Sequence, residues 1–149
     1  MSTFQVIVER SSLEVNNRGS LTGQLWMELD GQPFPEPLWN DFALVVLGWW
    51  CQAVSDMVCA RVTEGEMRFM DGNFSVRIHT GPEGHLRLVA VTGNDCEVAA
   101  CSSSVEKVRR ELVAAAKVVL EFCESRHLDS EDVRALEAGV SALGMNTSN

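Results

Sequence analysis

The residues of this chain best suited to nucleophilic, acid–base or metal chemistry are its three histidines and five cysteines. Cys96, Cys101, Cys123 and His127 combine thiols with an imidazole, and both groups are preferred zinc ligands. The C-x4-C spacing followed by C-x3-H is not among the usual zinc patterns, and Cys123 lies close to the apolar stripe of a predicted helix. We therefore expect buried thiols, an exposed histidine at a helix end and no bound metal.

A cysteine–histidine hydrolase is the sharper enzymatic alternative, with Cys51 or Cys59 as its nucleophile. Cys51 follows the Trp49-Trp50 pair in the most apolar segment of the chain, where burial makes a thiol inert. Arg61 is a cation close to Cys59 in the sequence, and this is weak support for a reactive thiol.

Histidine catalysis has little support in the sequence. His79 and His85 flank the same predicted turn, so they could face each other across a hairpin. No nucleophile motif accompanies them, and solvent-facing strand positions are the simpler interpretation. The chain also lacks the signatures of nucleotide-binding loops, zinc proteases and serine hydrolases. The sequence therefore predicts a non-catalytic protein without a cofactor.

The elements that would position these groups begin with a hairpin and a helix. Alternating apolar and polar residues predict strands over Thr3–Glu9 and Leu21–Leu29, joined by a loop over Ser11–Ser20 that is rich in Ser, Asn and Gly. From Leu38 to about Val54 the chain is nearly all apolar and too long for a typical strand, which predicts a buried helix.

A group of strands comes next. The segments Glu66–Met70, Asn73–Thr80, His85–Val91 and Asp95–Ala100 are strand-like. Asp71-Gly72 joins the first two, and Asp-Gly between alternating segments is a strong hairpin signal. We predict a meander of three or four antiparallel strands.

Two helices close the chain. Ser103 and Glu106 fit a capping box, and behind them apolar residues repeat at three- and four-residue steps from Val105 to Phe122. The last helix is predicted to open at Asp129 or Ser130 and to end near Gly144.

The element order contains no sustained βαβ alternation, which favours an α+β fold. We predict one domain over residues 1–144, in which a single antiparallel sheet of five to six strands packs against the buried helix and two C-terminal helices. Residues 145–149 are expected to form a frayed tail.

The apolar stripe from Val105 to Phe122 has a second interpretation, a dimer seam. It covers fewer than three heptads and contains Ala115, whereas a coiled coil needs three or four heptads. Packing against the chain's own sheet is the simpler explanation. A monomer and a homodimer both stay open.

Charge indicates the class of partner. The chain has a net charge of −9, and residues 1–75 alone hold ten acidic residues against four arginines. Such a surface repels phosphate backbones and anionic membranes and speeds encounters with basic proteins. The first ten residues show no secretory signal, and an odd number of cysteines favours reduced thiols. We expect a cytoplasmic protein with a basic protein partner, and no binding to nucleic acid or membrane.

Two segments carry a resemblance to a known class of protein. They are Phe34-Pro35 with Trp39-Asn40-Asp41-Phe42 and Leu47-Gly48-Trp49-Trp50, followed by Arg68-Phe69-Met70-Asp71-Gly72-Asn73-Phe74. In these motifs the first half of the chain resembles small bacterial proteins of toxin–immunity loci. The resemblance implies a compact, acidic, cytoplasmic protein that binds and occludes one cognate toxin domain.

Tryptophans beside carboxylates predict where such a partner would bind. Aromatic side chains with a charged rim are typical anchors of protein interfaces. The predicted partner-binding residues are Trp26, Glu28, Asp30, Glu36, Trp39, Asp41 and Asp71. Asp41 has a second interpretation, because it lies near the start of the predicted buried helix and would then matter only for folding. An acidic secretion chaperone or another interaction module is the alternative function, and a small cysteine-dependent enzyme is the third.

Overall fold

The computed structural model describes residues 2–59 and 62–144. Its first sheet contains the long hairpin of β1 (Phe4–Val15) and β2 (Leu21–Leu29), with β3 (Gln32–Phe34) and β4 (Asn40–Asp41) both pairing along the other edge of β2. All pairs are antiparallel. β1 extends well into the segment predicted as a loop, because a register shift between Glu9 and Glu14 lets the strand continue to Val15.

The second sheet is the predicted meander. It contains β5 (Glu64–Arg68), β6 (Phe74–Thr80), β7 (His85–Thr92) and β8 (Glu97–Ser104), each antiparallel to the next, with the 3-10 turn η1 (Pro82–Gly84) before β7. The expected single sheet of five to six strands is therefore wrong in detail, because the α+β chain forms two four-stranded sheets.

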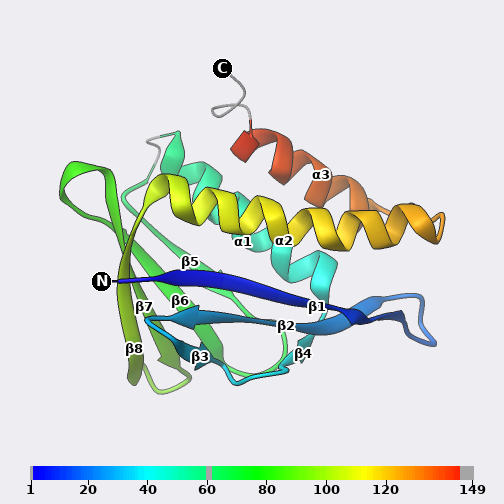
Figure 1. Cartoon of the computed structure of the whole chain (residues 1–149), viewed down its shortest axis with the longest axis horizontal. Helices are drawn as coiled ribbons and strands as arrows, with labels where there is room; N and C mark the ends of the chain where they lie inside the picture. Colours follow the sequence, from blue (N-terminus) through cyan, green and yellow to red (C-terminus); the bar gives the residue numbers. More distant parts are fainter. Residues whose placement is uncertain (1, 60–61, 145–149) are drawn as a thin grey trace.

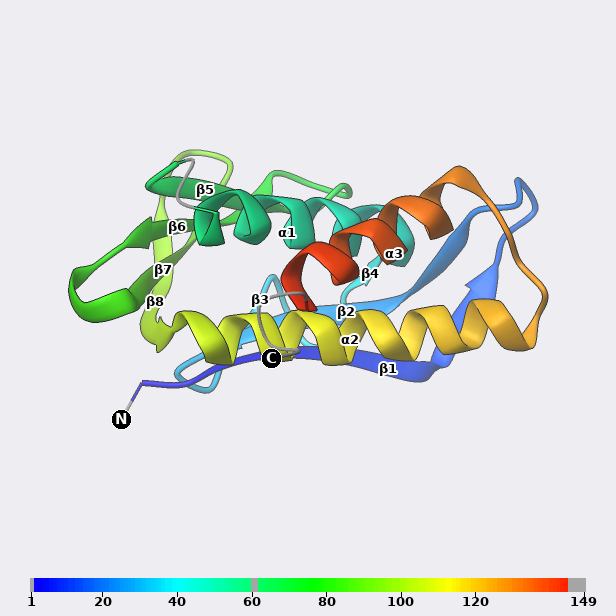
Figure 2. The same cartoon turned by 90° about the horizontal axis from the view of Figure 1, so that it is seen from above.

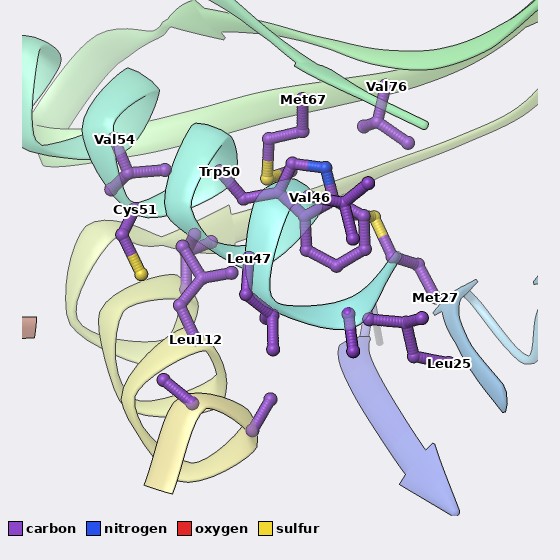
Figure 3. Close-up of a cluster of buried hydrophobic side chains, with 14 of the residues drawn as sticks. Leu25, Met27, Val46, Leu47, Trp50, Cys51, Val54, Met67, Val76 and Leu112 are labelled. Carbon is purple, nitrogen blue, oxygen red and sulfur yellow. The ribbon is translucent and has the colours of Figure 1, made fainter. Parts of the chain in front are cut away.

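Helix α1 (Ala43–Val58) packs against both sheets. It contacts β2 of the first sheet and β5 of the second, and the sheets also meet directly where β8 contacts β1 and β2. Figure 3 shows its buried face, where Trp50 lies between Met67 of the second sheet and Met27 of the first, and Leu47 also points into the core. The helix begins five residues later than predicted, because Asn40 and Asp41 pair with β2 as a strand.

Helix α2 (Val105–Ser125) lies along the outer edge of β1, as Figures 1 and 2 show. Its cap is Ser104, whose Oγ accepts a hydrogen bond from Lys107 N at 3.0 Å, one residue after the predicted cap. Glu111 Oε1 accepts a hydrogen bond of 2.9 Å from Val6 N, so a side chain of α2 occupies a backbone donor on the edge of β1.

The apolar stripe of α2 faces the core of the same chain. Val108, Leu112, Ala115 and Val119 are all buried within it. This burial agrees with packing on the chain's own sheet rather than with an exposed seam.

Helix α3 (Glu131–Gly144) covers α1 and α2 on the side away from the first sheet (Figure 1). Gly139 permits the close approach, because a Cβ there would lie 2.9 Å from Cys51 Cβ. No helix in the described part of the chain is long and apolar enough to cross a membrane. The predicted frayed tail, residues 145–149, lies outside the described residues.

Candidate functional site

Asp41 is a buried carboxylate that holds two distant segments together. Its side chain is 2% exposed and accepts four hydrogen bonds. Oδ1 accepts from Phe42 N at 2.7 Å, whereas Oδ2 accepts from Trp39 Nε1 at 3.0 Å and from the backbone N–H groups of Met70 and Asp71 at 3.2 and 3.3 Å. The chain before α1 is thereby fixed to the turn between β5 and β6.

Four aromatic rings reinforce the same junction. Trp39 and Phe34, from the first sheet, each pack edge-to-face against Phe69 and Phe74 beside the β5–β6 turn, with ring centroids 5.2–6.5 Å apart. Gly72 makes the turn possible, because it adopts a φ of +88° and a Cβ there would lie 2.8 Å from the Phe74 ring.

Apolar side chains remain exposed at this junction. Leu38 is 56% exposed and Met70 is 40% exposed. Leu38 precedes Trp39, whose indole donates to Asp41 Oδ2, and Met70 donates its own backbone N–H to the same oxygen. Leu38 also has a φ of +62°, a left-handed conformation that is unusual for a leucine and costs about 1 kcal/mol or more. The fold therefore keeps an exposed leucine in a strained conformation beside the half-buried Trp39.

Two carboxylates border these apolar groups. Glu36 lies on the segment between Phe34 and Trp39, and Asp71 follows Met70; both are exposed. Neither carboxylate has a hydrogen bond or an ion pair within residues 2–59 and 62–144. We call residues 36–41 with residues 69–72 the Trp39 corner. It brings together four of the seven predicted partner-binding residues: Glu36, Trp39, Asp41 and Asp71.

Two of the predicted partner-binding residues, Trp26 and Asp41, are buried. Trp26 is only 8% exposed, although it lies on the expected polar face of β2. β3 ends opposite Met27 and β4 begins opposite Gln24, so the segment between them runs past Trp26. Its indole Nε1 is buried and has no hydrogen-bond partner among the described residues. Asp41 is equally inaccessible, since its carboxylate is enclosed by the four donors that it binds.

Glu28 and Asp30 lie away from the Trp39 corner. Leu25 N donates a hydrogen bond to Trp39 O, and Asp30 lies five residues beyond Leu25, or about 16 Å at the rise of an extended strand. The carboxylate of Asp30 accepts a hydrogen bond from Thr3 N at 2.7 Å, so it holds the start of β1. The predicted acidic surface is thus divided between the corner and the far end of the β2–β3 hairpin.

Burial distinguishes the five cysteines. Cys51, Cys101 and Cys123 are buried, whereas Cys59 and Cys96 are exposed. Burial raises the pKa of the Cys51 thiol to about 12 and, with the nearby Asp30 charge, raises the pKa of Cys101 to about 11. Burial also raises the pKa of Cys123. Such thiols stay protonated at neutral pH, so Cys51 is a poor nucleophile.

The histidines are not placed for joint catalysis. His79 pairs with Arg87 across β6 and β7, whereas His85 pairs with Ser104, and both are exposed. His79 Nδ1 lies 3.4 Å from a Glu64 oxygen. Within the described residues, no group of three or more His, Cys, Asp or Glu side chains is arranged to hold a metal ion. That no metal is bound stays a prediction.

No protein-family model, no curated protein and no solved structure matches this chain.

Sequence reasoning missed Leu38 and Met70 as exposed apolar residues of the corner. Met70 directly precedes the Asp71-Gly72 turn, and a long apolar side chain at a turn is a signal that could have been used. Leu38 lies at the start of the apolar run that was assigned to the helix. Nothing in its type distinguishes it from the buried residues that follow.

Proposed function

We propose that this protein is a non-catalytic, protein-binding inhibitor that neutralises a cognate toxin in the cytoplasm, in the manner of an immunity protein. The Trp39 corner carries the proposal. An exposed Leu38 and Met70 flank a half-buried tryptophan, and two exposed carboxylates, Glu36 and Asp71, border them. A central aromatic or aliphatic anchor with a charged rim is the arrangement that concentrates binding energy in protein interfaces.

The rigidity of the corner supports a binding role. Asp41 binds both segments, and the edge-to-face rings of Phe34, Trp39, Phe69 and Phe74 pack between them. A surface that is already ordered loses little conformational entropy when a partner docks, which favours affinity.

Its electrostatics support a basic partner. Because Glu36 and Asp71 have no internal cation among the described residues, a lysine or arginine of the partner would pair with them without breaking an existing ion pair. The net charge of −9 adds long-range attraction, which raises association rates most at low ionic strength. A toxin domain with a basic cleft fits these requirements.

The test is a growth assay in bacteria that produce the product of each gene adjacent to this one, with and without this protein. We expect one such product to stop growth and the wild-type protein to restore it. Leu38→Asp combined with Met70→Asp should abolish the rescue, because charges would replace the apolar anchors. Glu36→Lys combined with Asp71→Lys should slow association with the purified toxin about tenfold at low salt.

Matched controls separate binding from folding. Glu83, in the turn η1, and Glu97, at the start of β8, are exposed and have no ion pair within the described residues. Glu83→Lys with Glu97→Lys therefore makes the same change in net charge, and it should leave rescue and association nearly unchanged. Melting curves of all variants establish that they fold. The proposal is refuted if no neighbouring product is neutralised, or if both corner variants fold and rescue growth as well as the wild type.

The acidic residues predicted from the sequence can be tested by association with the purified toxin. Charge reversal at Glu28, Asp30 and Glu36 should slow association and weaken its salt dependence. Because Asp30 also binds Thr3 N, Glu36 alone is expected to account for most of the change that is independent of stability.

A further inference from the structure

Helix α2 and the end of α3 form a groove of about 360 Å³ on the helical side of the molecule. Its lining residues come from one stripe of α2 and from the last turn of α3: Glu106, Arg109, Arg110, Val113, Ala114, Lys117 and Leu143. The stripe lies on the side of α2 opposite Leu112 and Val119, which are buried in the core. This groove takes no part in the Trp39 corner.

The floor of the groove is apolar and held in place. Leu143 is fully buried, and its carbonyl accepts two hydrogen bonds from the Arg109 guanidinium, at 3.2 Å from Nε and 2.5 Å from Nη2. Arg109 is only 7% exposed and also pairs with Glu106 at 3.3 Å. A buried cation thus fixes the C-terminal end of α3 to α2, where the carbonyl ends of a helix favour positive charge. Val113 and the exposed Ala114 complete the floor.

The rim of the groove is basic, although the chain is acidic overall. Arg110 and Lys117 are exposed, and neither has an ion pair within the part of the chain that the structure describes. They lie two helical turns apart, or about 10 Å along the axis. Between Val105 and Val118 the helix carries four basic and two acidic side chains, against a net charge of −9 for the whole chain.

We infer that this groove is a second docking surface and that its occupant is an acidic amphipathic helix of a protein partner. Apolar side chains of that helix would contact the half-buried Val113 and the exposed Ala114, and carboxylates two turns apart would pair with Arg110 and Lys117. The small Ala114 side chain lets a helix backbone approach α2 closely. A basic partner, as expected at the Trp39 corner, would be repelled from this rim.

The binding test uses a defined probe with the full-length protein. The probe is an end-capped, fluorescently labelled alanine-based peptide of about 15 residues, long enough to form helix on docking. It carries two glutamates at the spacing of Arg110 and Lys117, with leucines on the same face between them. A matched peptide carries lysines in place of both glutamates. Fluorescence anisotropy should show saturable binding of the acidic peptide that weakens with salt, and no comparable binding of the basic one.

Variants of the protein assign the binding to the groove. Arg110→Glu with Lys117→Glu should weaken binding of the acidic peptide at least about tenfold. Ala114→Phe, which fills the groove at an exposed position, should weaken it without a change in charge. Arg18→Glu with Arg87→Glu is the matched control, because both arginines are exposed and have no ion pair within the described residues. It should leave binding within about twofold of the wild type.

Three results would overturn the inference. The first is equal binding of the acidic and basic peptides, or no saturable binding of either up to about 1 mM. The second is unchanged affinity of the folded Arg110→Glu, Lys117→Glu variant. The third is a wild-type dimer in sedimentation that this variant dissociates, since the groove would then hold a second copy of the chain. Toxin neutralisation is measured separately, so failure here and failure at the Trp39 corner are distinguishable.

Discussion

Replacing Asp41 by alanine tests the idea that this carboxylate joins the two sheets. The substitution leaves four backbone or indole N–H groups without their acceptor. A hydrogen bond to a charged group contributes about 1.5 kcal/mol, so the two bonds of 2.7 and 3.0 Å account for about 3 kcal/mol, and the two longer ones for about 1 kcal/mol more. Removing a buried charge recovers part of its desolvation cost, which leaves a net loss of about 3 kcal/mol.

Urea denaturation followed by tryptophan fluorescence measures this loss. A destabilisation of about 3 kcal/mol corresponds to a midpoint about 1.5 M lower and a melting temperature about 10 °C lower for a chain of this size. Asp41→Asn should lose about half as much. One amide oxygen can still accept from Trp39 Nε1 and from the two turn N–H groups, and only the bond from Phe42 N is lost.

Asp71→Asn is the matched control, because Asp71 is exposed and its carboxylate makes no hydrogen bond among the described residues. It should change the free energy of unfolding by less than about 0.5 kcal/mol. The reasoning is refuted if Asp41→Ala unfolds within about 0.5 kcal/mol of the wild type. It is refuted as well if the asparagine and alanine variants are equally destabilised, because the effect would then not follow the count of accepted hydrogen bonds.

Two further predictions concern the core. Leu47→Asp places an unpaired charge at a fully buried position of α1 and should abolish the cooperative melt. The buried charge costs several kcal/mol against a total stability of about 5–15 kcal/mol. Trp49→Asp, at a position that is 43% exposed, should retain a cooperative melt. Thiol titration at pH 8 should modify Cys59 and Cys96 first and reach Cys51, Cys101 and Cys123 only after unfolding. Rapid modification of all five thiols would contradict this order. Burial raises the pKa of Cys51 to about 12 in the folded chain, so the stability gained by keeping this thiol neutral is complete below pH 9. It is lost as the pH rises towards 12, and urea denaturation at a series of pH values measures that loss.

The elements were largely predictable from local pattern, whereas their division into two sheets was not. The meander from β5 to β8 follows from alternation and from the Asp71-Gly72 turn, and α2 and α3 follow from helical periodicity and their caps. Periodicity indicates which residues share a face, but it does not indicate which edge pairs with which. Helix α1 contacts both β2 and β5, and these contacts join residues distant in the sequence, which local pattern does not specify.

The candidate site was predictable only in part, for the same reason. Trp39, Glu36 and Asp71 could be selected by residue type, and their position in one corner depends on the hydrogen bonds of Asp41 to the β5–β6 turn. The alternation of β2 places Trp26 among polar neighbours, and its burial in the folded chain is not visible in that local pattern. The prediction includes the five positions before Ala43 in the helix, because three of them are apolar and the local pattern gives no sign that Asn40 and Asp41 pair as a strand.

The bond between Val6 N and Glu111 affects more than the position of α2. An uncovered strand edge offers unpaired N–H and C=O groups to any other chain, and this is how sheet proteins begin to aggregate. At Val6 the donor is occupied by a carboxylate whose second oxygen pairs with Lys107 at 3.4 Å. A strand from another molecule would have to displace a charged, already bound group to pair there. The edge of the hairpin is thus closed to strand addition at Val6, and only after α2, which begins about ninety residues after β1 ends, has packed against it.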